Sequence, residues 1–111
     1  MVVLSGMIRR DEALLKLHEW LSGGATILCR AALPGIAFEM ESVIGRLEDE
    51  ELVLVSGGSH LSLRLNLPGE EFLLTAWEDS PLPSEGTGSS LVILFPVRGV
   101  TRDSVTLVVK E

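Results

Sequence analysis

The chain has 111 residues, of which 46% are hydrophobic and 23% are charged, a balance typical of a folded domain and not of a disordered segment. Its 16 acidic and 9 basic residues give a formal net charge of −7, which disfavours binding to nucleic acid or to anionic membrane surfaces. The single cysteine, Cys29, lies in an apolar stretch, as is typical of a buried thiol in a reducing compartment. We therefore expect one cytoplasmic domain over residues 1–111, with no nucleic-acid or membrane partner.

The first predicted element is a helix over residues 9–22. Leu14, Leu17 and Leu21 recur at spacings of three and four, so they lie on one face of a helix. The glycine pair at 23–24 follows directly, and glycine is the residue that most often ends a helix. This is the only helix that the pattern predicts.

An antiparallel β-meander is predicted over residues 25–77. Its clearest strand is the run 60–67, in which leucines alternate with polar residues and therefore fall on one side of a strand. A turn with two glycines separates this run from the apolar run 52–55, which predicts a hairpin. Upstream, the alternation in a long strand changes phase close to Gly45, which indicates a bulge or a bend.

The last third of the chain is predicted to contain a loop and a hairpin. Proline, serine, glycine and acidic residues over 78–90 predict a mobile loop, and the apolar runs within 91–109 predict a C-terminal β-hairpin. The expected fold is mainly β, of the α+β class. One N-terminal helix packs on a curved antiparallel sheet or small barrel of about six to seven strands.

No pattern in the chain indicates a catalytic residue, a metal site or a cofactor. The acidic turn at 48–51 lacks the ligand spacing and the glycine of a calcium-binding loop. The candidates for ligand binding are polar side chains on predicted strand faces, namely His60, Arg64, Glu39 and Glu41. Glu39 and Glu41 share a face, as paired carboxylates must, although alternating glutamates also serve to solvate an exposed strand.

Two predicted strands, 72–77 and 91–97, carry apolar residues on both faces, which exceeds what one small core needs. The interface candidates on these strands are Trp77, Phe72, Leu91 and Ile93. They predict self-association of the chain into a homo-oligomer or, failing that, binding to a different protein.

The order of predicted elements over residues 14–79 resembles that of the Sm-like small β-barrels. The resemblance rests on the helix, the glycine pair at 23–24, the bent strand 36–47 and the strands that follow it. It implies a small barrel that assembles into rings. The chain lacks the Asp and Asn pair with which that family contacts nucleotides and is strongly acidic, so we expect assembly without RNA binding. A cystatin-like arrangement, with one helix cradled by a curved sheet, fits the same order of elements.

The function predicted from the sequence is a non-catalytic β-rich binding or assembly module that self-associates through an edge strand. One alternative is a small enzyme with a pocket between helix and sheet that uses His60 with Glu39 or Glu41. A second alternative is an acidic protein that binds a basic protein partner through the turn at 48–51.

Overall fold

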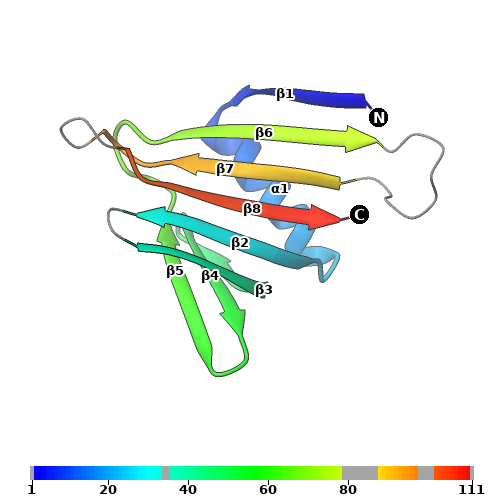
Figure 1. Ribbon diagram of the computed structural model, residues 1–111, viewed down its shortest axis with the longest axis vertical. Coiled ribbons are helices and arrows are strands. Elements are labelled where there is room, and N and C mark those ends of the chain that lie inside the picture. Colours follow the sequence, from blue (N-terminus) through cyan, green and yellow to red (C-terminus); the bar gives the residue numbers. More distant parts are fainter. Residues whose placement is uncertain (1, 34–35, 79–87, 98–101, 111) are drawn as a thin grey trace.

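The computed structural model describes residues 2–33, 36–78, 88–97 and 102–110 of the chain. This part of the chain forms one helix and eight strands (Figure 1). In chain order they are β1 (Val2–Ile8), α1 (Arg10–Ser22), β2 (Thr26–Leu33), β3 (Ile36–Glu48), β4 (Glu51–Ser56), β5 (Ser59–Arg64), β6 (Glu71–Glu78), β7 (Gly88–Leu94) and β8 (Ser104–Lys110). Within the described residues, α1 is not long and apolar enough to cross a membrane.

All eight strands belong to a single antiparallel sheet in the order β1-β6-β7-β8-β2-β3-β4-β5. The predicted fold class is confirmed, because one helix packs on a curved antiparallel sheet. The sheet does not close into a barrel, and β1 and β5 are its two edges. The strand that the sequence pattern did not reveal is β1, whose apolar run is short and is interrupted by Ser5 and Gly6.

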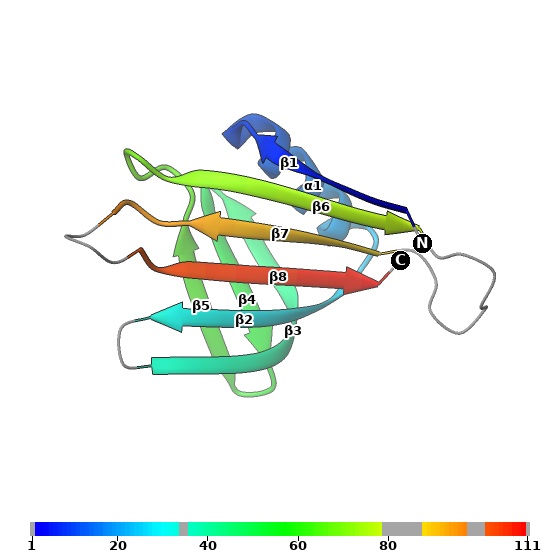
Figure 2. The ribbon, with the colours of Figure 1, turned by 45° about the horizontal axis from the view of Figure 1, so that its top comes forward.

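A bend within β3 gives the sheet its two layers. The register with β4 shifts between Ile44 and Arg46, so Gly45 forms the predicted bulge. A Cβ atom on Gly45 would lie 2.5 Å from Cγ2 of Val55, and only glycine fits there without displacing this neighbour. Beyond the bend, β4 and β5 lie behind the layer that contains β6, β7, β8 and β2 (Figure 2). The predicted hairpin of β4 and β5 is confirmed.

The core lies on the side of the sheet that α1 covers. The helix contacts β3 and β6 and buries Ala13, Leu17 and Trp20. Alternate residues of the strands point toward the same interior, and they include Ile27, Cys29, Leu52, Leu54, Leu91, Ile93, Leu107 and Val109. The intervening residues point away from the helix, and this outer side is called the helix-free face below.

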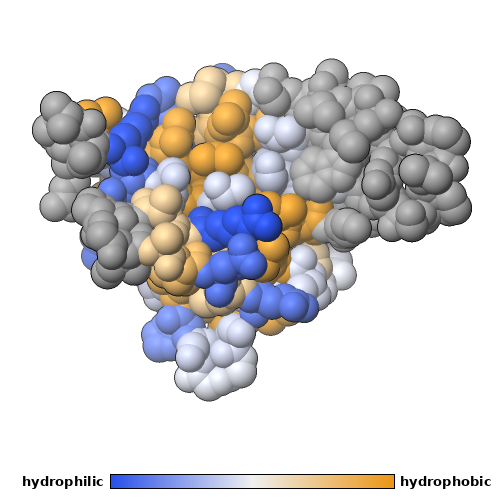
Figure 3. Space-filling view, viewed as in Figure 1, coloured by the Kyte–Doolittle hydropathy of each residue, from blue (hydrophilic) through white to orange (hydrophobic). Residues whose placement is uncertain are grey.

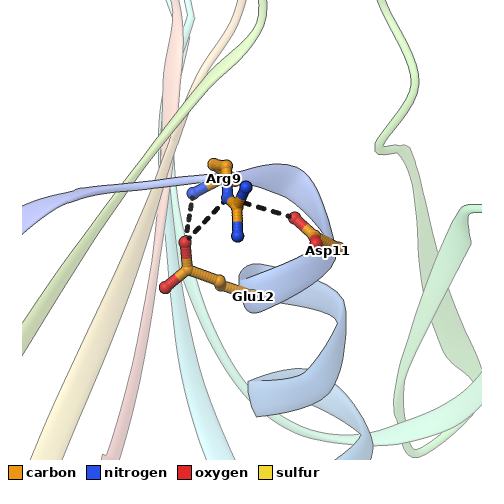
Figure 4. A network of polar contacts seen from close by, with 3 residues as sticks. All are labelled: Arg9, Asp11 and Glu12. Carbon is orange, nitrogen blue, oxygen red and sulfur yellow. Dashed lines mark hydrogen bonds and ion pairs between the residues drawn. The ribbon is translucent and has the colours of Figure 1, made fainter.

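The start of α1 is formed by interactions of Arg9, the residue that precedes it. The backbone N–H of Arg9 donates to Glu12 Oε1 at 3.3 Å, and its side-chain Nε donates to the same oxygen at 3.3 Å (Figure 4). Asp11 adds an ion pair of 3.8 Å with Arg9. The acidic side chains thus occupy the first turn, where the helix dipole favours negative charge. Ser22 is the last helical residue, so the predicted helix over 9–22 differs by one residue.

The meander ends at β5 and does not continue into β6. The chain turns at Pro68 and Gly69, where Glu70 N donates to Leu67 O at 3.2 Å and Gly69 has a φ of 81°. Instead of pairing with β5, β6 returns to the front layer and pairs with β1 and β7. The predicted mobile loop lies largely outside the described residues, and the strands on either side of it extend to Glu78 and from Gly88.

Candidate functional site

The four predicted ligand-binding residues lie on the helix-free face. Glu39 and Glu41 are exposed on β3, and His60 and Arg64 are exposed on β5, because each alternates with the buried residues of its strand. The predicted enzyme pocket between helix and sheet therefore contains none of them. The placement of His60, Glu39 and Glu41 in such a pocket is thus wrong, because the space between helix and sheet is filled by the core residues.

These four residues do not form one cluster. The carboxylate of Glu39 is bound to Arg30 Nε at 2.7 Å. Glu39 and Glu41 lie before residues 43–48, which are the part of β3 that pairs with β4. They therefore precede the part of β3 that leads to the hairpin of β4 and β5. His60 and Arg64 lie a further strand away and near opposite ends of β5. Glu39 and Arg64 line two different hollows of the surface.

Three of the predicted interface residues belong to the core of a single chain. Phe72, Leu91 and Ile93 are buried among the side chains between sheet and helix. They are therefore unavailable to a partner, and the second apolar face of β6 and β7 is made by other residues. The side chain of Trp77 lies outside the described residues, although its backbone pairs with Val3 and Gly88.

The acidic turn between β3 and β4 is a tight hairpin. Asp49 and Glu50 have φ values of 52° and 58°, the two left-handed conformations that two-residue hairpins require. Arg46 pairs with Glu51 at 2.6 Å across the hairpin. A shallow hollow of about 170 Å³ beside the turn is lined by Asp49, Glu50, Glu51, Arg64 and Asn66. In the described part of the chain, no group of three His, Cys, Asp or Glu side chains is arranged to bind a metal ion.

The two edges of the sheet differ in chemistry. The edge strand β1 pairs with β6 over all seven of its residues, Val2 to Ile8, and contains no charged residue and no proline. The opposite edge strand, β5, exposes His60 and Arg64 together with two serines. Met7, near the end of β1, is 54% exposed. The edge at β1 thus lacks the charges that protect the edge at β5.

Uncharged side chains continue from β1 across the helix-free face. The cross-strand register places Met7 opposite Leu73, Leu73 opposite Val92, and Val92 opposite Thr106. Arg30 follows opposite Thr106, so this row carries no charge before β2. Figure 3 shows the hydrophobic surface over the upper strands of this face and the hydrophilic surface below it.

A buried carboxyl group lies where β1, α1 and β6 meet. Glu70 precedes β6, is only 9% exposed, and has no hydrogen-bond partner for either carboxylate oxygen. Arg10, the first residue of α1, has a buried Nε without a partner and donates from Nη2 to Leu67 O at 3.5 Å. Burial raises the pKa of Glu70 to about 7, and the positive charge of Arg10 opposes this rise. The local sequence did not identify this group, because its burial depends on contacts between distant segments.

Cys29 has the features of a structural thiol. Its side chain is fully buried in β2, and burial raises the pKa of the thiol to about 11. The thiolate is the nucleophilic form, so Cys29 is a poor nucleophile at neutral pH. The interpretation of Cys29 as a buried, unpaired thiol is confirmed.

No protein-family model, curated protein sequence or solved structure matches this chain. The resemblance to the Sm-like proteins therefore stays a prediction. The edge strand β1 and the buried carboxyl of Glu70 are the two features on which functional proposals rest.

Proposed function

We propose that the protein is a non-catalytic assembly module that self-associates by pairing β1 of one copy with β1 of a second copy. The observation that carries the proposal is the uncharged, seven-residue edge strand β1. An edge strand presents unpaired backbone N–H and C=O groups, which proteins usually protect with charges, prolines, bulges or very short strands. None of these devices occurs within Val2–Ile8, and its register with β6 is continuous.

Electrostatics favour this strand as the contact between two copies. The chain has a net charge of −7, so two copies repel each other over most of their surfaces. Contact through a strand without charged residues minimises this repulsion. A twofold axis lets the same strand serve both copies, with β1 running antiparallel to its symmetry mate.

The helix-free face contributes to the same contact. Joining two β1 strands makes one sheet from two, and it brings Met7 and Leu73 of each copy toward the middle of that sheet. Apolar side chains that are exposed in one copy then gain neighbours from the other. Neither an enzyme nor a metal-binding role has comparable support, because His60, Glu39 and Glu41 are exposed and dispersed.

The test is the solution mass of the full chain, measured by light scattering on a sizing column over a range of concentrations. The variant is Met7→Lys, which places a charge on the exposed edge strand. Its matched control is Leu15→Lys, because Leu15 is 67% exposed on α1 and the substitution changes the net charge by the same amount. Absorbance at 260 and 280 nm across the peak reports any bound nucleic acid.

We expect the wild type and Leu15→Lys to form the same oligomer and Met7→Lys to shift toward the monomer. Far-ultraviolet circular dichroism should show that all three proteins are folded, since both substituted side chains are exposed. A wild-type protein that is monomeric at every concentration would overturn the proposal. An oligomer that persists in Met7→Lys but dissociates in Leu15→Lys would place the interface on the helix instead.

A further inference from the structure

The position of Glu70 relative to β1 is set by the sheet register. Ile8 lies opposite Phe72 at the end of the β1–β6 ladder. The ladder ends there, and Arg10 in α1 reaches the turn before β6, because its Nη2 donates to Leu67 O at 3.5 Å and Glu70 N donates to the same oxygen at 3.2 Å. The pair therefore stands at the point where the edge strand becomes the helix, and where the turn at Gly69 leads into β6.

The carboxyl of Glu70 is buried there without the partners that a carboxylate requires. Neither oxygen accepts a hydrogen bond, and Arg10 Nε is itself buried without a partner. A buried polar group without a hydrogen bond is costly, and an ionised one is costlier still. A neutral carboxylic acid is therefore much easier to accommodate than a carboxylate in this position.

Few charges are available to compensate an ionised Glu70. The charged side chains on the adjoining segments are those of the α1 start (Arg9, Arg10, Asp11 and Glu12), Glu71 on β6, and Arg102 and Asp103 immediately before β8. Arg9 is already paired with Asp11 and Glu12. Arg102 is already committed, because it pairs with Glu71 at 2.7 Å and donates to the carbonyl oxygens of Phe95 and Gly69. Arg10 is the charged group that acts on the carboxyl of Glu70.

We propose that protonated Glu70 locks the junction of β1 and α1 onto the start of β6, and that loss of this proton releases the junction. In the closed form the neutral acid is buried beside Arg10. In the open form the carboxylate reaches water, and the end of β1 and the first turn of α1 separate from β6. Because opening is confined to this junction, the rest of the core stays folded.

The direction of the pH dependence follows from linkage. Burial raises the pKa of Glu70 from 4.5 to about 7 in the closed form, so the closed form binds the proton more tightly than the open form. The bound proton stabilises the closed form fully below pH 4.5, and this stabilisation is lost as the pH rises through 7. If the open form has the ordinary pKa, the opening equilibrium constant rises about 70-fold between about pH 5 and about pH 8.

One consequence deepens the proposed function and rests on it. The strand β1 is the proposed contact between copies, so opening of its junction should weaken assembly above pH 7. The lock itself does not depend on assembly. It is therefore tested on dilute protein, where failure of self-association cannot be mistaken for failure of the lock.

The experiment is native-state hydrogen exchange of the full chain from about pH 5 to about pH 8, with amide rates corrected for their intrinsic dependence on pH. The reporters are the amides of β1 that bond to β6 and the amide of Ala13, which donates to Arg9 O at 3.0 Å, and the amides of β4 and β5 serve as the internal reference. The variant Glu70→Gln mimics the neutral acid in shape. Glu41→Gln is the matched control, because Glu41 is exposed on β3, opposite Leu28 of β2, and belongs to neither β1, α1 nor β6.

We expect the opening constant of the reporters to rise with pH in the wild type and in Glu41→Gln, and to become nearly constant in Glu70→Gln. A wild-type opening constant that does not change with pH would overturn the lock. So would a pH dependence that survives in Glu70→Gln. If Glu70→Gln does not fold, the pKa of Glu70 in the wild type is measured instead, from the ¹³C chemical shift of its carboxyl as a function of pH. A midpoint close to 7 that coincides with opening supports the lock, and one close to 4.5 refutes it.

Discussion

Replacing Gly45 with alanine tests whether the bend in β3 depends on the absence of a side chain. The new Cβ would lie 2.5 Å from Val55 Cγ2, about 1 Å closer than carbon atoms pack at best. Val55 is β-branched, so its methyl group cannot easily rotate away. Gly45 has no positive φ, so alanine meets no backbone strain of its own. Gly45→Ala should therefore lower the free energy of unfolding by about 1–3 kcal/mol, the cost of overpacking at one contact.

The assay is urea unfolding followed by circular dichroism, performed as a double-mutant cycle with Val55→Ala. Removing the Val55 methyl groups should abolish the cost, and Gly45→Ala should then be neutral or stabilising by about 0.4–1 kcal/mol, because alanine restricts the unfolded chain. Gly58→Ala is the matched control, since a Cβ there meets no atom within 4 Å. An equal loss of stability from Gly45→Ala in both backgrounds would refute this account of the bend.

Two further predictions concern the core. Cys29 should react about a hundredfold more slowly with iodoacetamide at about pH 8 in the folded protein than in urea. The reason is that burial raises the pKa of its thiol to about 11 and so depletes the thiolate. Equal labelling rates would mean that the thiol is not buried. Leu17→Ala, at a fully buried position where α1 contacts the sheet, should lower the unfolding free energy by about 2–5 kcal/mol. Leu15→Ala, on the exposed side of the same helix, should change it by no more than about 0.5 kcal/mol, and a similar loss from both substitutions would contradict the packing of α1.

Local patterns predicted most of the elements. The spacing of Leu14, Leu17 and Leu21 predicted the helix. The alternating leucines over 60–67 predicted a strand with one buried face, and the strand observed there, β5, already ends at Arg64. The phase change at Gly45 predicted the bulge, which the register of β3 and β4 confirms. These features depend on residues close together in the chain, whose periodicity reveals which face is buried.

The candidate site was less predictable. The pattern of β5 correctly placed His60 and Arg64 on its polar face, but it carried no information on which side of the sheet the helix would cover. The apolar residues Phe72, Leu91 and Ile93 had the composition of an interface, and their burial became apparent only when α1 and the rear layer were in place. Likewise, nothing in the segment around Glu70 distinguishes it from the exposed Glu71 beside it.

The sequence by itself therefore determined the mainly β class, the single N-terminal helix, the bend at Gly45 and the hairpin of β4 and β5. The tertiary structure alone decided that β6 leaves the meander to pair with β1 and β7, that β1 is an uncharged edge, and that Glu70 is buried near the charge of Arg10. The physical reason is the range of the interactions. Periodicity and turn chemistry act over a few residues, whereas strand order and burial depend on contacts between segments that are distant in the chain.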